Sequence, residues 1–295
     1  RVSVSSGEII SKYKFWSLPK RYSSPQSTVS SVSKVFEETM QLHMLSDVSL
    51  GVFLSGGVDS SAVAAIAKSQ ADTQVSTYNL SFDETLYDEA KYARQAAKSL
   101  GTDHHEIKLT QSDFNENFIA SFESIDQPTF DGINTFFISK AIKDAGITVA
   151  LAGTGGDELF GGYSSFREVP KITRVGNIIN HVPECLANLT AGAWNKIMES
   201  KYGAVPPQTR WGKLADLIRV KGNTIGAYQT TYSLFTSEFQ NKLSGQKSEN
   251  IKFGVDKALY ATLSEDIVNC STLESISNLE LNMFIEQRLM RDTDA

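Results

Sequence analysis

Short segments that read as strands alternate with amphipathic stretches along the first half of the chain. These segments lie at 48–54, 74–82, 104–109 and 147–152, each is followed by a polar residue or glycine, and those at 48–54 and 147–152 are nearly continuous apolar runs. Runs of this kind are typical of parallel strands that are buried on both faces. Between them, apolar residues recur at three- and four-residue steps or alanine predominates, which predicts helices over 28–45, 60–69, 87–100, 112–124 and 133–145. The alternation predicts an α/β fold, a doubly wound parallel sheet with helices on both faces.

The strand pattern fades after residue 163. Helical periodicity dominates near 173–200, 209–220, 223–243 and 255–295, whereas the first 26 residues are rich in serine and carry no clear periodicity. We therefore expect three parts: an extended lead-in over 1–26, an α/β core over 27–166, and a mainly helical region over 167–295.

Composition narrows the class of protein. The chain has 295 residues, of which 41% are hydrophobic, and a formal net charge of −6, which argues against duplex nucleic acid or an anionic membrane surface as a partner. The two cysteines, Cys185 and Cys270, are far apart, so a disulfide scaffold and a thiolate metal site are excluded. No apolar run approaches the roughly 18 residues of a membrane-spanning helix. We expect a soluble, cytoplasmic protein.

The first candidate site is the turn Ser55-Gly56-Gly57-Val58-Asp59-Ser60-Ser61, between a predicted buried strand and an alanine-rich helix. Its glycines allow a sharp turn and close approach of the backbone to a ligand. The amides at the start of the following helix form an anion site, to which the serine hydroxyls add donors. Asp59 offers a carboxylate to a divalent cation. The turn has neither the Walker lysine nor a GxGxxG pattern. On its own, it is also compatible with a simple helix cap.

The second candidate is the glycine-rich stretch 151–163, which leaves the end of another predicted strand and contains Asp157. Ligands of doubly wound sheets bind beyond the carboxyl ends of the strands. Both glycine turns are expected at that edge, with Asp59 and Asp157 close together. Two carboxylates beside two anion-binding turns suit Mg²⁺ bound to a polyphosphate. A flexible surface loop is the alternative for this stretch alone.

The two motifs, in this order and at this spacing, resemble the C-terminal synthetase domain of the asparagine synthetase family, the glutamine-hydrolysing amidotransferases. Further stretches follow the family pattern, at 77–82, 87–94, 101–106, 126–132 and 289–294. The resemblance is dense over 27–166 and sparse over 167–275. It implies the ATP-pyrophosphatase fold, which resembles that of the adenine nucleotide alpha-hydrolases.

The resemblance also implies a role for individual positions. Phe53 and Leu80 match the apolar residues that flank adenine, and Ala152 and Gly153 match a backbone contact to the nucleotide. The pyrophosphate loop corresponds to Ser55, Gly56, Gly57, Val58, Asp59 and Ser60. The magnesium carboxylates correspond to Asp59 and Asp157. The implied catalytic residues are Asp59, Asp157, Glu158 and Tyr163, with Tyr163 in the acceptor site.

The implied chemistry uses ATP and Mg²⁺. A substrate carboxylate, aspartate in the family, attacks the α-phosphorus and releases pyrophosphate, and ammonia from a glutaminase domain on the parent chain then displaces AMP to form the amide. Two alternatives stay open: an amidotransferase for a sugar carboxylate in polysaccharide biosynthesis, and a nucleotide-binding homologue without turnover. A tRNA-modifying ATP-pyrophosphatase is disfavoured by the acidic composition. The oligomeric state is open, with a homodimer as one arrangement.

Three departures from the family pattern qualify the expectation. Thr154 stands where the family usually has an acidic residue of the acyl-transfer machinery, and a non-acidic residue there resembles homologues found with polysaccharide biosynthesis. The glutaminase half with its N-terminal cysteine is expected to precede residue 1, with residues 1–26 as the lead-in from it. A catalytic lysine of the family is expected beyond Ala295, so that the helical region is truncated.

A histidine pair at 104–105 suggests a metal site at first sight. Neighbouring residues on a strand point to opposite faces, so His104 and His105 are not expected to bind one ion. We expect them to have a structural role.

Overall fold

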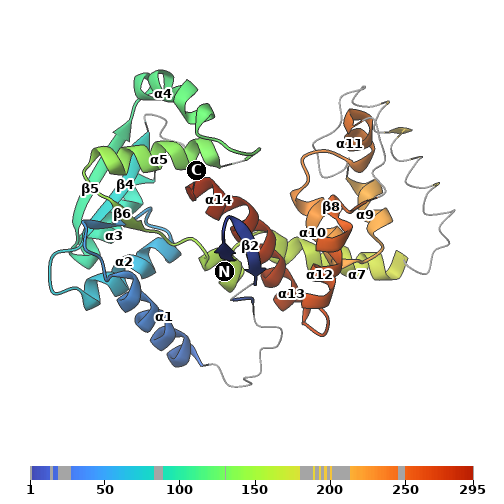
Figure 1. Cartoon of the computed structure of the whole chain (residues 1–295), viewed down its shortest axis with the longest axis horizontal. Helices are drawn as coiled ribbons and strands as arrows, with labels where there is room; N and C mark the ends of the chain where they lie inside the picture. The colour runs from blue at the N-terminus through green and yellow to red at the C-terminus, as the bar shows by residue number, and fades with distance from the viewer. Residues whose placement is uncertain are drawn as a thin grey trace. The chain divides into compact units, whose positions relative to one another are not determined.

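The computed structural model describes residues 2–13, 16–18, 28–82, 89–129, 131–179, 213–244 and 250–294, together with residues 189, 193, 196, 197 and 200 (Figure 1). By its contacts the chain divides into two compact units. The core unit consists of Pro25–Gly162 and Glu280–Ala295, and the helical unit of Arg1–Ser24 and Tyr163–Leu279. The first segment of the core unit, 25–162, has nearly the same bounds as the predicted core of 27–166. The core unit also contains residues 280–295, which were predicted to belong to the helical region.

The core unit is built on a four-stranded sheet in the order β5-β4-β3-β6, and all the strand pairs are parallel. The strands are β3 (Leu50–Phe53), β4 (Ser76–Phe82), β5 (Asp103–Leu109) and β6 (Val149–Leu151). Each lies within or close to one of the four predicted strand segments. The parallel order confirms the predicted α/β fold, since parallel strands need crossover connections and these are helical here.

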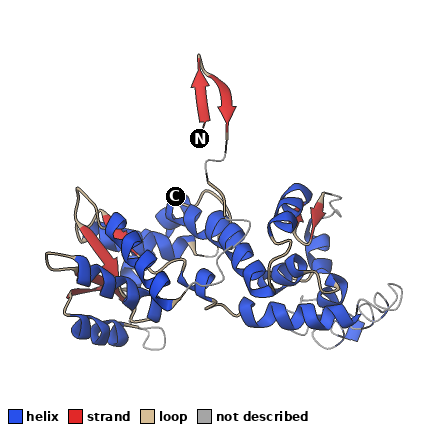
Figure 2. Cartoon of the chain, turned by 90° about the horizontal axis from the view of Figure 1, so that it is seen from below, coloured by secondary structure: helices blue, strands red, loops and turns tan. Residues whose placement is uncertain are grey.

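Helices cover the sheet on both faces (Figures 1 and 2). Helix α1 (Val29–His43) precedes the sheet, and the helices between its strands are α2 (Val58–Gln70), α3 (Ala90–Leu100), α4 (Gln111–Glu123) and α5 (Gly132–Asp144). One apolar cluster joins α1, α2 and α3 to the sheet through side chains such as Met40, Val52 and Ala64. On the other face, α5 contacts β4, and α4 packs on α5 with the rings of Phe114 and Phe137 stacked 5.1 Å apart. The ends of α1 and α4 are fixed by capping boxes.

The histidine pair lies on β5 with its side chains on opposite faces. His104 Nδ1 is 3.0 Å from Thr77 Oγ1, whereas the ring of His105 stacks on Tyr78 at 5.0 Å. Thr77 and Tyr78 are neighbours on β4, so the two imidazoles face different sides of the sheet. The structural role expected for this pair agrees with these contacts.

The core unit is completed by three elements outside the alternating pattern. Helix α6 (Gly156–Phe160) follows β6 directly. After the helical unit, the chain returns as the π-helix η1 (Glu280–Leu289) and continues as α14 (Met290–Asp294). Glu280, the first residue of this returning segment, is completely buried.

The helical unit contains α7 (Ser165–Ile179), α9 (Leu214–Val220), α10 (Thr224–Tyr232), α11 (Ser237–Ser244), α12 (Lys257–Asp266) and α13 (Thr272–Leu279). Its buried side chains include Val169, Ile225, Tyr228 and Ile276. It also holds two antiparallel hairpins that the sequence did not predict: β1 (Val2–Ser5) with β2 (Glu8–Lys12), and β7 (Ile251–Lys252) with β8 (Val255–Asp256). The helical predictions for residues 180–188, the region of Cys185, and for 209–212 lie outside the described residues.

Candidate functional site

The two glycine turns leave the carboxyl ends of neighbouring strands. β3 and β6 are hydrogen-bonded partners, with Leu50 opposite Val149 and Val52 opposite Leu151. The first turn follows β3 and leads into α2, and the second follows β6 and leads into α6. The parallel register therefore brings both turns to one edge of the sheet, as the sequence predicted.

The turns are in direct contact, and the absence of side chains on two glycines permits it. A Cβ atom on Gly153 would lie 2.9 Å from the backbone nitrogen of Ser60 and 3.0 Å from Cβ of Asp59. A Cβ atom on Gly156 would lie 2.5 Å from Cγ of Asp59 and less than 3 Å from both carboxylate oxygens. The second turn thus packs on the first helical turn of α2, with Gly156 against the Asp59 carboxylate.

Asp59 and Asp157 influence each other electrostatically. The pKa of Asp59 is raised above its ordinary value, first by burial and then by the negative charge of Asp157. Both effects disfavour the charged carboxylate in the protein alone. Asp157 itself lies against Gly162, where a Cβ atom would overlap its carboxylate oxygen Oδ1. Both carboxylates therefore occupy space that a side chain on the neighbouring glycine would fill.

This pair of acids fits a divalent cation bound together with a ligand. Mg²⁺ in proteins commonly takes one or two carboxylates and completes its shell with substrate phosphates and water. The described residues contain no group of three or more histidine, cysteine, aspartate or glutamate side chains able to hold a metal ion. Asp59 and Asp157 suit the two-carboxylate case, because a cation between them would offset the repulsion that raises the pKa of Asp59.

Hydroxyl groups hold the first turn in shape. Oγ of Ser55 and Oγ of Ser60 lie 2.9 Å apart, the amide of Ser55 donates to Ser60 Oγ, and Gly57 N donates to Ser55 Oγ. Gly57 is the N-cap of α2 and has no side-chain partner to cap the helix. The amides of the first helical residues, from Val58 on, have no acceptor within the helix itself. They are available to an anion at the positive end of the helix dipole.

Gly56 anchors the same turn to α3. Its φ angle is +83°, which residues with a side chain rarely adopt. A Cβ atom there would also lie 2.5 Å from the carbonyl carbon of Tyr92 and 2.7 Å from the nitrogen of Ala93. The turn therefore packs directly on the backbone at the start of α3, and this packing requires glycine at position 56.

The remaining predicted residues occupy different surroundings. Phe53 pairs with Tyr78 across the β3–β4 ladder, and Leu80 follows two residues further on β4, so both half-buried side chains share one face of the sheet at its carboxyl edge. Ala152 is exposed, and Glu158 on α6 is almost completely buried. Tyr163 is half-buried and is the first residue of the segment 163–279, which belongs to the helical unit.

Two features of the site were not predicted from the sequence. Nothing local indicates that Gly156 contacts Asp59, because the Gly155-Gly156 pair marks only a turn. The contact of the returning helix η1 with α6 was also missed, since these elements are far apart in the chain. Thr154 is exposed beside Gly155, whose φ angle is +104°.

Comparison with known proteins assigns the chain to a family. The asparagine synthase family model matches residues 31–295, which is most of the chain. Curated relatives include an enzyme described as a putative asparagine synthetase (glutamine-hydrolysing) 2 from Methanocaldococcus jannaschii, 33% identical over 56% of this chain and 35% of that protein. Asparagine synthetase (glutamine-hydrolysing) 1 of Bacillus subtilis is 33% identical over 48% of this chain and 22% of that protein. Asparagine synthetase B of Escherichia coli is 33% identical over 55% of this chain and 33% of that protein.

The chain therefore matches only about a third or less of the length of these relatives. Among the described residues, no helix combines the length and apolar character needed to cross a membrane.

Proposed function

The chain belongs to the asparagine synthase family, and from this membership we propose that it is the synthetase part of a glutamine-dependent amidotransferase, a ligase that forms a C–N bond. A substrate carboxylate attacks the α-phosphorus of ATP, which gives an acyl-adenylate and pyrophosphate. Ammonia then attacks the acyl carbon and AMP leaves, so that the carboxylate becomes an amide. The observation that carries the proposal is the contact between the two glycine turns, which brings Asp59 and Asp157 together at the carboxyl edge of the sheet.

The first turn and the start of α2 would bind the β- and γ-phosphates. The free amides beginning at Val58 donate to phosphate oxygens, and the hydroxyls of Ser55 and Ser60 exchange their mutual hydrogen bond for bonds to the ligand. Preorganised donors of this kind stabilise the charge that develops on the departing pyrophosphate, and such electrostatic effects are usually large in catalysis.

Asp59 and Asp157 would hold Mg²⁺ through one carboxylate each. When bound, the ion neutralises phosphate charge and withdraws electron density from the bond that breaks. The two carboxylates, which lie directly against Gly156 and Gly162, would orient the polyphosphate relative to the turn. Burial of Asp59 lowers its hydration and so strengthens its attraction for a cation.

Phe53 and Leu80 would form the apolar surface for adenine, on the face that they share at the edge of the sheet. The backbone at Ala152 and Gly153 is the candidate contact for the rest of the nucleoside by family position, and the packing of Gly153 on Asp59 and Ser60 holds it beside the first turn. Glu158 and Tyr163 stay proposed catalytic residues by family position. The almost complete burial of Glu158 suits a group that orients the loop rather than one that meets solvent.

The acceptor is aspartate in the main proposal, with ammonia supplied by a glutaminase domain. Thr154 favours a second candidate, a sugar carboxylate. The exposed hydroxyl of Thr154 has no negative charge at the position where the family usually carries one, so the acceptor pocket differs in charge from that of an aspartate-specific enzyme.

The test is exchange of labelled pyrophosphate into ATP by the full-length protein with a panel of carboxylic acids. Exchange that depends on aspartate supports the main proposal, and exchange only with a uronic acid supports the second. Asp59→Asn is the variant that should abolish exchange in either case. If no acid supports exchange although MgATP binds, the chain is a nucleotide-binding homologue and the proposed activity is wrong.

A further inference from the structure

The returning segment, residues 280–294, contacts two separate parts of the core unit. Its first part, η1, contacts α6, the helix that carries Asp157, and its second part, α14, contacts α5. π-helices are rare in proteins, and those that occur are often found at functional sites. The ten residues of η1 therefore suggest a role for this segment beside α6. The segment is the link between α6 and the start of α5.

Thr129 is the central contact between the segment and α5. Its hydroxyl donates to Asp292 Oδ2 at 2.5 Å and accepts hydrogen bonds from the amides of Asp131 and Gly132 at 3.1 and 3.0 Å. Gly132 is the first residue of α5, so Thr129 satisfies an amide at the start of this helix while Asp292 fixes the orientation of its hydroxyl. Gly132 has no side chain, and a Cβ atom there would lie 2.6 Å from Cγ2 of Thr129.

Two further polar contacts flank this one. Arg291 Nη2 forms an ion pair with Asp126 at 2.9 Å, and Gln127 Nε2 donates to the backbone oxygen of Gln287 at 3.2 Å. Both Arg291 and Asp126 are about half exposed, so their pair adds little on its own. The Thr129–Asp292 bond, which is partly buried and charge-assisted, is the strong member of the set.

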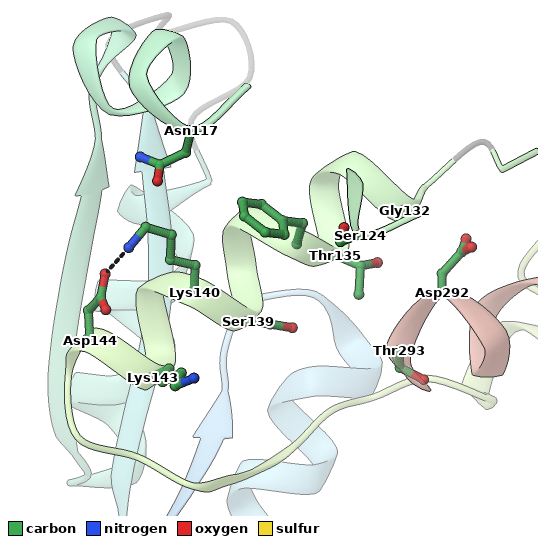
Figure 3. Close-up of a pocket in the computed structure, with 11 residues that line it drawn as sticks. Asn117, Ser124, Gly132, Thr135, Ser139, Lys140, Lys143, Asp144, Asp292 and Thr293 are labelled. Atoms are coloured by element: carbon green, nitrogen blue, oxygen red, sulfur yellow. Dashed lines mark hydrogen bonds and ion pairs between the residues drawn. The ribbon is translucent and has the colours of Figure 1, made fainter. Parts of the chain in front are cut away.

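A cavity of about 590 Å³ beside this contact is lined by residues of α4, α5 and α14. Figure 3 shows Asp292 and Thr293 of α14 on one side and Thr135 and Ser139 of α5 on the other. Gly132 and Asp292, which Thr129 joins, both line this cavity. The hydrogen bonds around Thr129 therefore attach the segment to the start of α5 beside the cavity.

The topology places this attachment at the edge that carries the glycine turns. α5 precedes β6, which is parallel to the other strands, so α5 runs back across the sheet from its carboxyl edge to its amino edge. Gly132 and the preceding turn with Thr129 therefore lie at the carboxyl edge. The returning segment joins this turn to α6, and so to the loop that carries Asp157.

We propose that Thr129 and Asp292 are positioning residues for the nucleotide site, which act by fixing the start of α5 relative to α6 through the returning segment. Neither side chain takes part in the chemistry. This inference rests on the proposed function, because it assigns to the pair an effect on MgATP. The expected consequence of breaking the bond is a looser carboxyl edge and weaker MgATP binding by about threefold to thirtyfold, the range for mutations that act through intervening contacts.

The experiment compares four variants of the full-length protein by MgATP binding in a calorimeter and by the KM and kcat of pyrophosphate exchange. Thr129→Val removes the hydroxyl and keeps the shape, Thr129→Ser keeps the hydroxyl, and Asp292→Asn removes the charge. Lys140→Met is the matched control, since Lys140 lines the same cavity and forms an ion pair with Asp144 at the other end of α5.

The inference predicts that Thr129→Val and Asp292→Asn raise Kd and KM for MgATP, that Thr129→Ser restores both, and that Lys140→Met leaves them unchanged. Hydrogen exchange should also become faster in the first turn of α5 and in α6 in the two weakened variants. Binding by Thr129→Val and Asp292→Asn equal to that of the wild type overturns the inference and leaves the proposed function intact. Equal weakening by Lys140→Met shows a general loss of stability and also overturns it. Absence of MgATP binding by the wild type overturns the proposed function itself.

Discussion

The substitution Gly156→Ala is expected to weaken MgATP binding while it leaves the free energy of unfolding nearly unchanged. The φ angle of Gly156 is not positive, so an alanine fits the backbone, and within a helix alanine is favoured over glycine by about 0.5–1 kcal/mol. The new Cβ atom would lie 2.5 Å from Cγ of Asp59, whereas ordinary contact begins at 3.4 Å. The carboxylate must therefore withdraw by roughly 0.9 Å.

The side chain of Asp59 is able to make this movement by rotating. A rotation of about 30° away from a preferred rotamer costs about 0.5–1.5 kcal/mol, which nearly cancels the gain from alanine. The free energy of unfolding should change by less than about 1 kcal/mol. A ligand bond to Mg²⁺ is about 2.0–2.1 Å long and tolerates little distortion, so a displacement of this size removes Asp59 from the metal. MgATP binding should weaken by about 10- to 100-fold.

The assay measures urea unfolding and MgATP calorimetry on the same samples, with Gly153→Ala as the comparison. At Gly153 the overlap involves backbone atoms, N of Ser60 and C of Asp59, which no side-chain rotation relieves. That variant should lose both MgATP binding and about 1–3 kcal/mol of stability. If Gly156→Ala binds MgATP as tightly as the wild type, Asp59 is not a metal ligand. If it is as unstable as Gly153→Ala, the contact is not one that a rotation of Asp59 relieves.

Two further predictions concern stability. Because the pKa of Asp59 is raised in the folded protein by burial and by Asp157, its ionisation destabilises the fold; this cost is absent below the ordinary value of 3.8 and develops as the pH rises through and above it. Asp59→Asn should therefore be more stable than the wild type to urea at pH 7 without ligand, and a difference of the same size at pH 3.5 would contradict the assignment. In the helical unit, Gly176→Ala would place a Cβ atom onto the backbone nitrogen of Gly222, so it should cost about 2 kcal/mol in urea unfolding, and an unchanged midpoint would show that the helix and the turn are not packed as described.

The central strand β3 was predictable because it is short and both of its faces are covered. Val52 and Leu54 face the cluster formed with α1 to α3, while Gly51 gives room to the ring of Tyr78 on the other face, so apolar or small residues occupy successive positions and the run is continuous. The local sequence was therefore sufficient to predict this strand. The ends of the strands differ from the predicted ones by at most two residues, because pairing with the neighbouring strand, which no local pattern contains, decides where a strand begins.

The missed features depend on contacts between distant parts of the chain or on weak patterns. Residues 280–289 have helical periodicity, which indicates a helix but cannot distinguish a π-helix or show that it contacts α6. The hairpin β1–β2 turns at Ser6-Gly7, a recognisable turn pair, but its apolar residues, among them Val4 and Ile9, are exposed and give no clear burial pattern. The convergence of the glycine turns was predictable from topology, whereas the contact of Gly156 with Asp59 required coordinates.

The core unit is discontinuous in sequence, and this affects how the protein is made. Gly162 leaves the ribosome more than a hundred residues before Glu280 does. At about 5–20 residues per second, this interval is roughly 6–24 s. During translation the sheet is able to form early, but η1 and α14 are added to it only after the whole helical unit has been synthesised. A nascent chain arrested before residue 280 would therefore expose the surfaces of α5 and α6 that η1 and α14 later cover, and would offer them to chaperones.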